Sequence, residues 1–341
     1  MSQPIEHHVD RVLAGEALDR LQTGLVFEAL VAGRLSPERV EAMLVAMADR
    51  GETIDEIVGA AEVMRRHVTR IACDEPRTID TCGTGGDGIS TFNVSTAAAI
   101  VAAGAGAVVA KHGNRTNTRA SGSVEALEAL GVNVAASQRV VERCIREARI
   151  GFLNAAKLHP AMGRVAELRR HIGRPTIFNL LGPLTNPAGV RRQVVGVPRV
   201  DLMMKVAEAL ARLGAERAFV VHGRDGLCDL TITGPSSYVE VAQGKLTRGE
   251  LVPEDVGLAP SSLDSLRVAG PGQSAEAIRS ILAGEAGPRR NHALLNAAVA
   301  LVAAGLATDL EDGVHRSARS IDNGAAAKTL ERWAAISGEG A

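Results

Sequence analysis

The chain has 341 residues, enough for two domains, and 46% of them are hydrophobic, as expected of a globular protein with a sizeable core. Its 38 Lys and Arg residues balance 39 Asp and Glu residues, and only 2% of the residues are aromatic. This composition argues against the basic surface of a nucleic-acid-binding protein and against the aromatic stacking surface of a single-strand binder.

The cysteines and the first segment of the chain indicate the cellular compartment. Cys73, Cys82, Cys144 and Cys228 are widely spaced and form no C-x-x-C motif, which argues against a disulfide framework and a structural zinc site. Charged residues occur throughout the first 30 positions, unlike a secretory signal, and no apolar run reaches the length of a membrane span. We therefore expect a cytoplasmic protein that binds neither nucleic acid nor membrane.

The first 72 residues predict a small all-helical domain. Apolar residues recur at three- and four-residue intervals over 18–33. Ser36 before Pro37 gives a helix cap followed by proline at the first helical position, and Thr53 and Glu56 have the spacing of a capping box. No strand candidate occurs before about residue 77.

From residue 77 onward, strand candidates alternate with segments of helical length. The strand candidates are 77–82, 107–111, 150–155, 193–197 and 217–223. The helices that we expect begin at about residue 95 and also cover 123–131, 291–305 and 319–336. This alternation predicts an α/β domain over 73–341, with a mostly parallel central sheet flanked by helices. Ligands of such sheets bind at the carboxyl ends of the strands.

A glycine-rich loop, GTGGD at 83–87, follows the first strand candidate. It precedes TFNVST at 91–96, a helix start that is rich in capping side chains. Backbone amides at a glycine turn and at a helix N-terminus form an anion site. The loop is neither G-x-G-x-x-G nor a P-loop, and taken alone it could also be a tight turn without a ligand.

A second polar loop, KHGNRTNTRASGS at 111–123, follows the second strand candidate. Its lysine and arginines can neutralise phosphate charge, while its hydroxyl groups and glycine amides can complete the hydrogen bonds. A solvated basic loop is the alternative interpretation. Two such loops at the ends of successive strands favour a ligand with more than one phosphate.

The sequence strongly resembles the anthranilate phosphoribosyltransferase family. The motifs that carry the resemblance occur in the family's order: GTGGD, TFNVSTA, KHGNR, SGS, LHPAM, TIFNLLGPLTNPA, VVHGRDGL and LLNAA. The resemblance extends to about residue 335. It implies transfer of the phosphoribosyl group of phosphoribosyl diphosphate (PRPP) to the amine of anthranilate, giving N-(5-phosphoribosyl)anthranilate and diphosphate in tryptophan biosynthesis.

The resemblance also implies the organisation of the molecule. The helical domain would include residues 1–72 and a contribution from about 165–188, and it would form the contact of a homodimer. The α/β domain would carry the PRPP site, and anthranilate would bind in the cleft between the two domains. Mg²⁺ would be the cofactor.

The site residues are likewise those that the resemblance implies. PRPP would be bound by Gly83, Gly86, Asp87, Thr91, Asn93, Val94, Ser95, Thr96, Lys111, His112, Gly113, Asn114, Arg115, Thr118, Arg119 and Ser123. Anthranilate would contact Gly83, His112, Asn114, His159, Arg169 and Pro183. The magnesium ligands would be Ser95 and Asp229.

The chemistry of these residue types agrees with the implied roles. Anthranilate is an anionic aromatic amine, and the guanidinium of Arg169 can bind a carboxylate with two parallel hydrogen bonds. Without the resemblance, Arg169 could be a surface arginine and His159 a structural histidine. Loss of diphosphate leaves positive charge on the ribose, so magnesium, oriented amides and positioning can promote the transfer without a covalent nucleophile. We expect Cys82 to be a small buried residue.

The chain departs from the family pattern at three places. The family usually has Asp-Glu after DGL, where this chain has Cys228 and Asp229. A thiol is a poor ligand for a hard cation, so we expect the second metal to bind more weakly or differently. Ala120 replaces a common lysine beside Arg119, and Pro175 replaces a frequent arginine.

Two alternative functions stay open. The chain could be a phosphoribosyltransferase for another aromatic acceptor, a possibility that Cys228 leaves open. It could also be a noncatalytic paralogue with the same fold. The KHGNR motif argues against a pyrimidine nucleoside phosphorylase, which would carry a different lysine-histidine loop.

Overall fold

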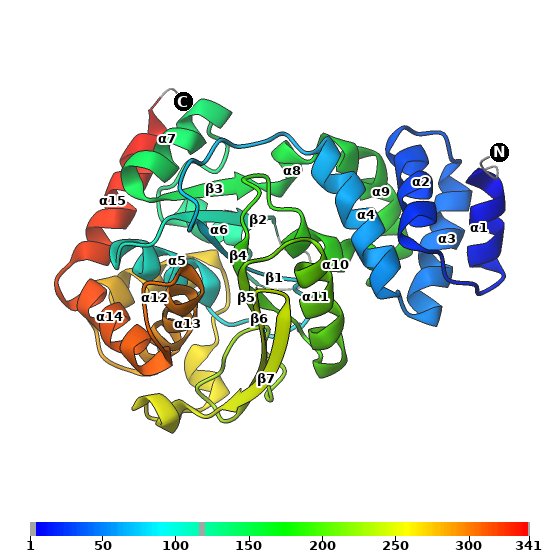
Figure 1. The fold of residues 1–341 in the computed structure, drawn as a ribbon. Helices are drawn as coiled ribbons and strands as arrows, with labels where there is room; N and C mark the ends of the chain where they lie inside the picture. Colours follow the sequence, from blue (N-terminus) through cyan, green and yellow to red (C-terminus); the bar gives the residue numbers. More distant parts are fainter. Residues whose placement is uncertain (1–4, 116–119, 340–341) are drawn as a thin grey trace.

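The computed structural model describes residues 5–115 and 120–339. Four helices at one end of the molecule form a bundle (Figure 1). They are α1 (Ile5–Leu13), α2 (Arg20–Val31), α3 (Pro37–Arg50) and α4 (Ile54–His67). The predicted starts of α3 and α4 are confirmed, because Ser36 accepts a hydrogen bond from the Arg39 amide and Thr53 forms a capping box with Glu56.

Two helices from the middle of the chain join this bundle. They are α9 (Gly163–Ile172), which contacts α3, and α10 (Ile177–Leu184), which contacts α3 and α4. The rings of Phe27 in α2 and Phe178 in α10 lie with centroids 5.8 Å apart. One continuous apolar cluster joins these helices to α11 (Val200–Arg212) and to one face of the sheet.

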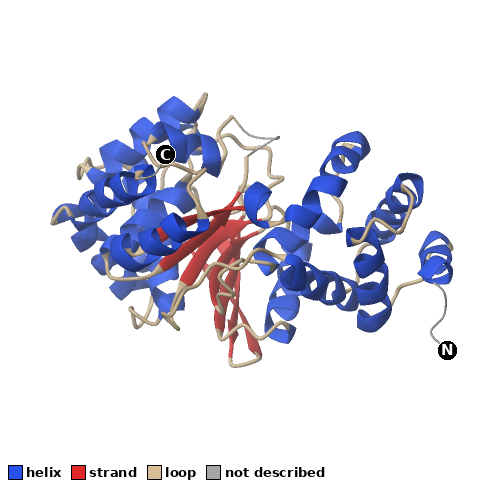
Figure 2. Ribbon diagram, turned by 90° about the horizontal axis from the view of Figure 1, so that it is seen from above, coloured by secondary structure: helices blue, strands red, loops and turns tan. Residues whose placement is uncertain are grey.

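A seven-stranded sheet forms the centre of the larger part of the molecule, with helices on both sides (Figure 2). Its strands are β1 (Ile79–Gly83), β2 (Val109–Gly113), β3 (Ile150–Asn154), β4 (Arg192–Gly196), β5 (Arg217–Gly223), β6 (Ser236–Ala242) and β7 (Lys245–Leu251). The strand order is β3-β2-β1-β4-β5-β6-β7, and the first five strands in this order are parallel. The predicted α/β class with a mostly parallel sheet is confirmed.

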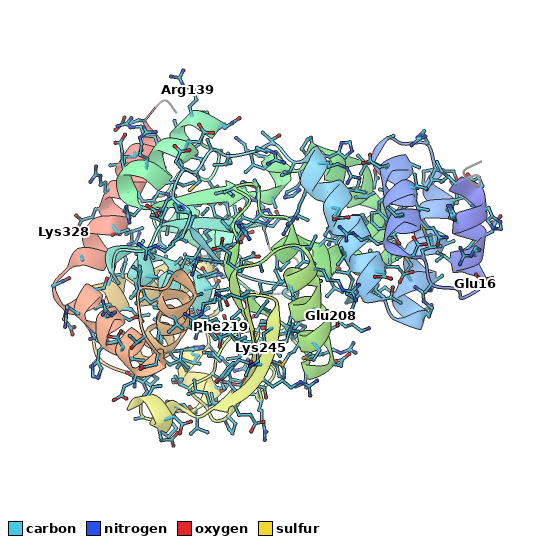
Figure 3. The ribbon with its side chains drawn as sticks, viewed as in Figure 1. Glu16, Arg139, Glu208, Phe219, Lys245 and Lys328 are labelled. Carbon is cyan, nitrogen blue, oxygen red and sulfur yellow. The ribbon has the colours of Figure 1, made fainter. Side chains whose placement is uncertain are left out.

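The opposite face of the sheet is covered by α5 (Val94–Gly104) over β1, β2 and β3 and by the C-terminal helix α13 (Pro288–Ala304) over β1, β4 and β5, and these two helices pack against each other. The other helices around it are α6 (Ser123–Ala129), α7 (Gln138–Ala148), α12 (Pro271–Leu282), α14 (Leu310–Asp322) and α15 (Ala325–Gly338). The short elements are α8 (Ala155–Leu158), η1 (Pro160–Met162), η2 (Pro253–Val256) and η3 (Leu263–Leu266). Figure 3 shows Phe219 of β5 inside the molecule and Glu16, Arg139 and Lys328 at its periphery.

Two features differ from the sequence-based expectation. The strands β6 and β7 form an antiparallel hairpin at the sheet edge that the strand candidates did not include. Its turn places Gln243 at φ 51° and Gly244 at φ 79°, a backbone twist that suits a two-residue hairpin. The single helix expected over 319–336 was wrong: Gly324, at φ 76°, separates α14 from α15.

No helix in the described part of the chain is long and apolar enough to cross a membrane.

Candidate active site

A cavity of about 220 Å³ lies at the carboxyl ends of β1 and β2. Many of the residues that the sequence predicts for the site line it: Gly83, Asn93, Val94, Ser95, Lys111, His112, Gly113, Asn114, Arg115, Ser123 and Asp229. The lining also includes residues that the sequence did not assign: Cys82, Thr84, Gly85, Ser121 and Gly122. Cys228, where the family usually has an aspartate, completes it. The structure thus brings together both polar loops and the segment that follows β5.

Some predicted residues lie outside this lining. Thr91 and Thr96 are buried and do not line it. The lining also omits Gly86, Asp87, His159, Arg169 and Pro183. Thr118 and Arg119 lie outside the described residues.

The glycine-rich loop has a backbone that requires its glycines. Gly85, Gly86 and Gly88 all have positive φ values between 65° and 91°, a region that residues with a Cβ rarely adopt. Asp87 anchors the loop, because its carboxylate accepts hydrogen bonds from the amides of Ile89 (3.3 Å) and Cys228 (3.2 Å). The loop is therefore tied to the segment that holds Cys228.

A buried hydrogen-bond network fixes the start of α5. Asn93 Oδ1 accepts hydrogen bonds from Ser121 Oγ at 2.6 Å and Ser274 Oγ at 2.7 Å. Asn93 Nδ2 donates to the carbonyl of Ser121 at 3.2 Å. The network joins the start of α5, the second polar loop and α12. It leaves one amide hydrogen of Asn93 available to a ligand.

Lys111 is the buried cation of the site, with 1% of its surface exposed. Its ammonium donates hydrogen bonds to the carbonyl of Thr81 at 2.6 Å and to Ser95 Oγ at 3.3 Å. Burial lowers the pKa of Lys111, and the negative charge of Asp80 opposes this shift. The side chain therefore directs positive charge toward the N-terminus of α5, where the backbone amides already favour an anion.

His112 and His159 form a neutral pair. Burial, with His159 close by, lowers the pKa of His112 to about 3, and burial lowers the pKa of His159 to about 4. His112 Nδ1 lies 3.1 Å from the carbonyl of Gly182, which can only accept, so this nitrogen is the donor. The two Nε2 atoms are 3.1 Å apart, so His159 donates to His112. The Nδ1 atom of His159 is therefore an acceptor.

Arg169 and Pro183 come from the two helices that join the bundle. The guanidinium of Arg169 lies 5.6 Å from the ring centroid of Phe178 in α10, and burial lowers its pKa. Pro183 is buried inside α10, and its carbonyl accepts a hydrogen bond from Gln193 Nε2 at 2.8 Å. The same helix supplies the Gly182 carbonyl that contacts His112, so α10 adjoins the histidine pair.

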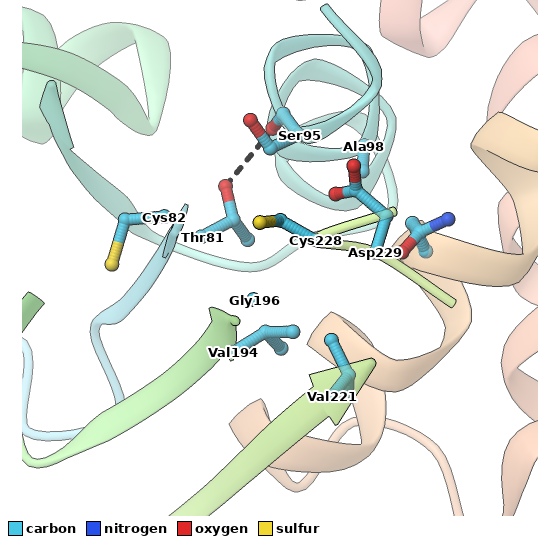
Figure 4. Close-up of a pocket in the computed structure, with 10 residues that line it drawn as sticks. Thr81, Cys82, Ser95, Ala98, Val194, Gly196, Val221, Cys228 and Asp229 are labelled. Carbon is cyan, nitrogen blue, oxygen red and sulfur yellow. Dashed lines mark hydrogen bonds between the residues drawn. The ribbon is translucent and has the colours of Figure 1, made fainter. Parts of the chain in front are cut away.

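The donors near the cavity fit a magnesium ion that is held together with substrate. No group of three or more His, Cys, Asp or Glu side chains in the described residues could hold a metal ion. Ser95, Cys228 and Asp229 do surround a small adjoining pocket (Figure 4). Magnesium is commonly held by one or two carboxylates together with substrate phosphates and water. The hydroxyl of Ser95 and the carboxylate of Asp229 suit such a site, whereas the thiol of Cys228 does not.

The structure also reveals site residues to which the sequence analysis assigned no role. Ser121 and Ser274 hold Asn93, while Asp80 and Asn186 hold the backbone of β2. Asp80 was visible in the sequence only as an acidic residue inside an apolar strand candidate. Ser274 lies 181 residues from Asn93, and no local pattern joins them.

The comparisons with known proteins cover both parts of the molecule. Residues 7–68 match the family described as "Glycosyl transferase family, helical bundle domain". Residues 75–327 match the family described as "Glycosyl transferase family, a/b domain". The anthranilate phosphoribosyltransferase of Anaeromyxobacter sp. (strain K) is 49% identical to this chain, over 97% of this chain and 98% of the relative. That of Rubrobacter xylanophilus is 47% identical, over 96% of each.

Solved structures of anthranilate phosphoribosyltransferases have the same fold as this chain. Anthranilate phosphoribosyltransferase from Thermus thermophilus matches with a TM-score of 0.91 and 42% identity, over 97% of this chain and 99% of that chain. The Saccharomyces cerevisiae enzyme in complex with PRPP and Mg matches with a TM-score of 0.88 and 27% identity, over 98% and 97% of the two chains. Sequence and fold agree over nearly the whole length, and the chain belongs to the anthranilate phosphoribosyltransferase family.

Proposed function

We propose that the cavity at the ends of β1 and β2 binds PRPP, and that anthranilate binds beside it, next to His112 and His159. The protein is then a transferase of tryptophan biosynthesis that joins the phosphoribosyl group to the amine of anthranilate. The observation that carries this proposal is the convergence of both polar loops, the start of α5 and the buried Lys111 on one cavity. The yeast relative binds PRPP and Mg, and another structure of it contains 4-fluoroanthranilate.

The proposed binding of PRPP depends on the positive groups that line the cavity. The glycine-loop amides, the N-terminus of α5 and Lys111 would hold the phosphates of PRPP. Mg²⁺ held by Ser95 and Asp229 would neutralise charge on the departing diphosphate. Lys111 reaches Ser95 Oγ directly, so ammonium and metal would act on the same group. Positive charge develops on the ribose as its bond to diphosphate breaks, and fixed phosphate contacts keep that carbon in place.

The proposed binding of anthranilate depends on the uncharged state of His112 and His159. At pH 7 both rings are uncharged because their pKa values are far below 7. The open Nδ1 of His159 can therefore accept a hydrogen bond from the amine of anthranilate, the neutral ring of His112 can pack against the acceptor, and neither histidine repels the nearby Lys111. Arg169 would bind the carboxylate of anthranilate, and Pro183 and Asn114 would form the walls of the pocket.

The wider organisation is proposed on similar grounds. Residues 1–72 and about 165–188 would form the helical domain, because α9 and α10 share its apolar cluster. This domain would form a homodimer contact, and the large exposed apolar side chains Leu13, Leu21 and Leu25 of its first two helices support that arrangement. None of the four cysteines, all of which lie in the described residues, forms a disulfide, which suits the reducing cytoplasm.

Turnover of the purified protein tests the proposed function. Adding PRPP and Mg²⁺ is expected to remove anthranilate fluorescence, because the product is N-substituted. Binding of PRPP without turnover of anthranilate would point to another aromatic acceptor. If neither binding nor turnover occurs, the protein is a noncatalytic paralogue and the proposal is wrong.

The thiol of Cys228 is expected to raise the magnesium requirement. Replacing it with aspartate adds a hard carboxylate beside Asp229, and the Mg²⁺ concentration for half-maximal rate should fall roughly 3- to 10-fold. A magnesium titration of the initial rate measures this, with Cys228→Ser as the matched control for loss of the thiol without gain of charge. Identical titrations for the Asp and Ser variants would show that position 228 does not contribute to metal binding.

A further inference from the structure

Asp80 is a fully buried carboxylate near the start of β1, the strand whose carboxyl end opens onto the site. Its Oδ1 accepts a hydrogen bond from the backbone amide of His112 at 3.0 Å. Its Oδ2 accepts one from Asn186 Nδ2 at 2.8 Å. Burying a carboxylate lowers the stability of the folded state unless hydrogen-bond partners replace the water that the charge loses. Both oxygens of Asp80 have such partners.

Asn186 connects the same carboxylate to the loop between α10 and β4. Its Nδ2 also donates to the carbonyl of Ala110 at 2.9 Å, and its Oδ1 accepts from the amide of Ala188 at 2.8 Å. Asp80 and Asn186 therefore join three elements: β1, β2 and the loop that follows α10. The α10 turn also supplies the Gly182 carbonyl that binds His112 Nδ1. His112 is thus held from its backbone and from its ring by connected elements.

Lys111 precedes His112 on β2, and Asp80 is the negative charge that acts on it most strongly. Burial raises the pKa of Asp80 and lowers that of Lys111, and each charge opposes the shift of the other. Cys82 and Asp229 oppose the lowering of the Lys111 pKa as well. Asp80 therefore acts on the residues of both halves of the proposed site, although it does not line the cavity.

We propose that Asp80 is a positioning residue for the transfer reaction. Its carboxylate holds the His112 amide and, through Asn186, the loop after α10, so that His112 meets the acceptor while Lys111 meets the phosphates of the donor. This inference rests on the proposed function, because it assigns a role within the same site.

The test compares Asp80→Asn with the wild type in turnover and in PRPP binding by calorimetry. Asparagine keeps the size of the side chain but offers one acceptor oxygen to two donors, so the local backbone must shift. A misplacement of this kind is expected to lower kcat about 10- to 100-fold. The dissociation constant of PRPP should rise. If Asp80 acted only through its charge, its removal would strengthen binding of the anionic PRPP, and tighter binding would overturn the proposal.

Glu56→Gln provides the matched control. Glu56 is also a fully buried carboxylate that accepts a hydrogen bond from a backbone amide, that of Leu18, but it lies in the helical bundle. Its loss should lower the melting temperature and leave kcat and both KM values within about twofold of the wild type. The same result for Asp80→Asn, with kcat and PRPP affinity unchanged, would show a purely structural role.

Asn186→Ala keeps the test decisive if Asp80→Asn does not fold. This variant removes one partner of the carboxylate and should also lower kcat and weaken PRPP binding, by less than Asp80→Asn. Unchanged values would overturn the proposal. Calorimetry separates this test from that of the proposed function, since PRPP binding can be measured whichever acceptor the protein uses. Absence of PRPP binding in the wild type would instead overturn the function itself.

Discussion

Replacing Lys111 with methionine is expected to lower kcat/KM for PRPP by roughly 100- to 1,000-fold. The ammonium is buried, is directed toward Ser95 by a contact to the Thr81 carbonyl, and lies in the cavity where the phosphates would bind. In such surroundings the attraction between the ammonium and a phosphate is much stronger than in water. Methionine has a similar length and tolerates burial, so the loss should reflect the missing charge rather than a cavity.

Steady-state kinetics and calorimetry with PRPP measure this effect, and thermal melting shows whether the variant is folded. Lys157→Met is the matched control. Lys157 also donates to a backbone carbonyl, that of Ala135, but it is exposed and lies outside the cavity. It should keep wild-type PRPP affinity. Unaltered PRPP binding by a folded Lys111→Met variant would contradict the assignment of the cavity to the donor.

The features that the sequence predicted well are those set by local patterns. The starts of α3 and α4 depend on Ser36, Pro37, Thr53 and Glu56, which act within one turn of each helix. The position of the cavity also followed, because parallel strands bring their carboxyl ends, and so the two polar loops, to one edge of the sheet. The β6–β7 hairpin was missed because its strands are partly exposed and its turn is Gln-Gly rather than Asn-Gly.

The features that the sequence could not predict are set by distant contacts. Gly196 shows this most clearly. A Cβ at this position would lie 1.7 Å from the carbonyl oxygen of Cys228, so the segment that carries Asp229 packs directly on the end of β4. Nothing within either stretch of sequence indicates that contact. The histidine pair likewise depends on the approach of His159 to His112, 47 residues away, while motif order alone indicates only that both belong to one site.

The second large effect is expected for Arg169→Ala, which should raise KM for anthranilate about 100-fold and change KM for PRPP little. In the described residues Arg169 has no carboxylate partner within ion-pair distance, and its guanidinium lies against the ring of Phe178. A partly desolvated cation of this kind binds a carboxylate strongly, because the guanidinium itself loses little further hydration on pairing.

Arg170→Ala is the matched control, since this neighbouring arginine is exposed. Its loss should leave both KM values close to those of the wild type. An acceptor without a carboxylate offers a sharper measurement: aniline should be an equally poor acceptor for the wild type and for Arg169→Ala. Equal increases in the KM values for PRPP and anthranilate would show that Arg169 supports the fold of α9 rather than binding the carboxylate. A rise for anthranilate alone would place the acceptor against the face of the bundle formed by α9 and α10.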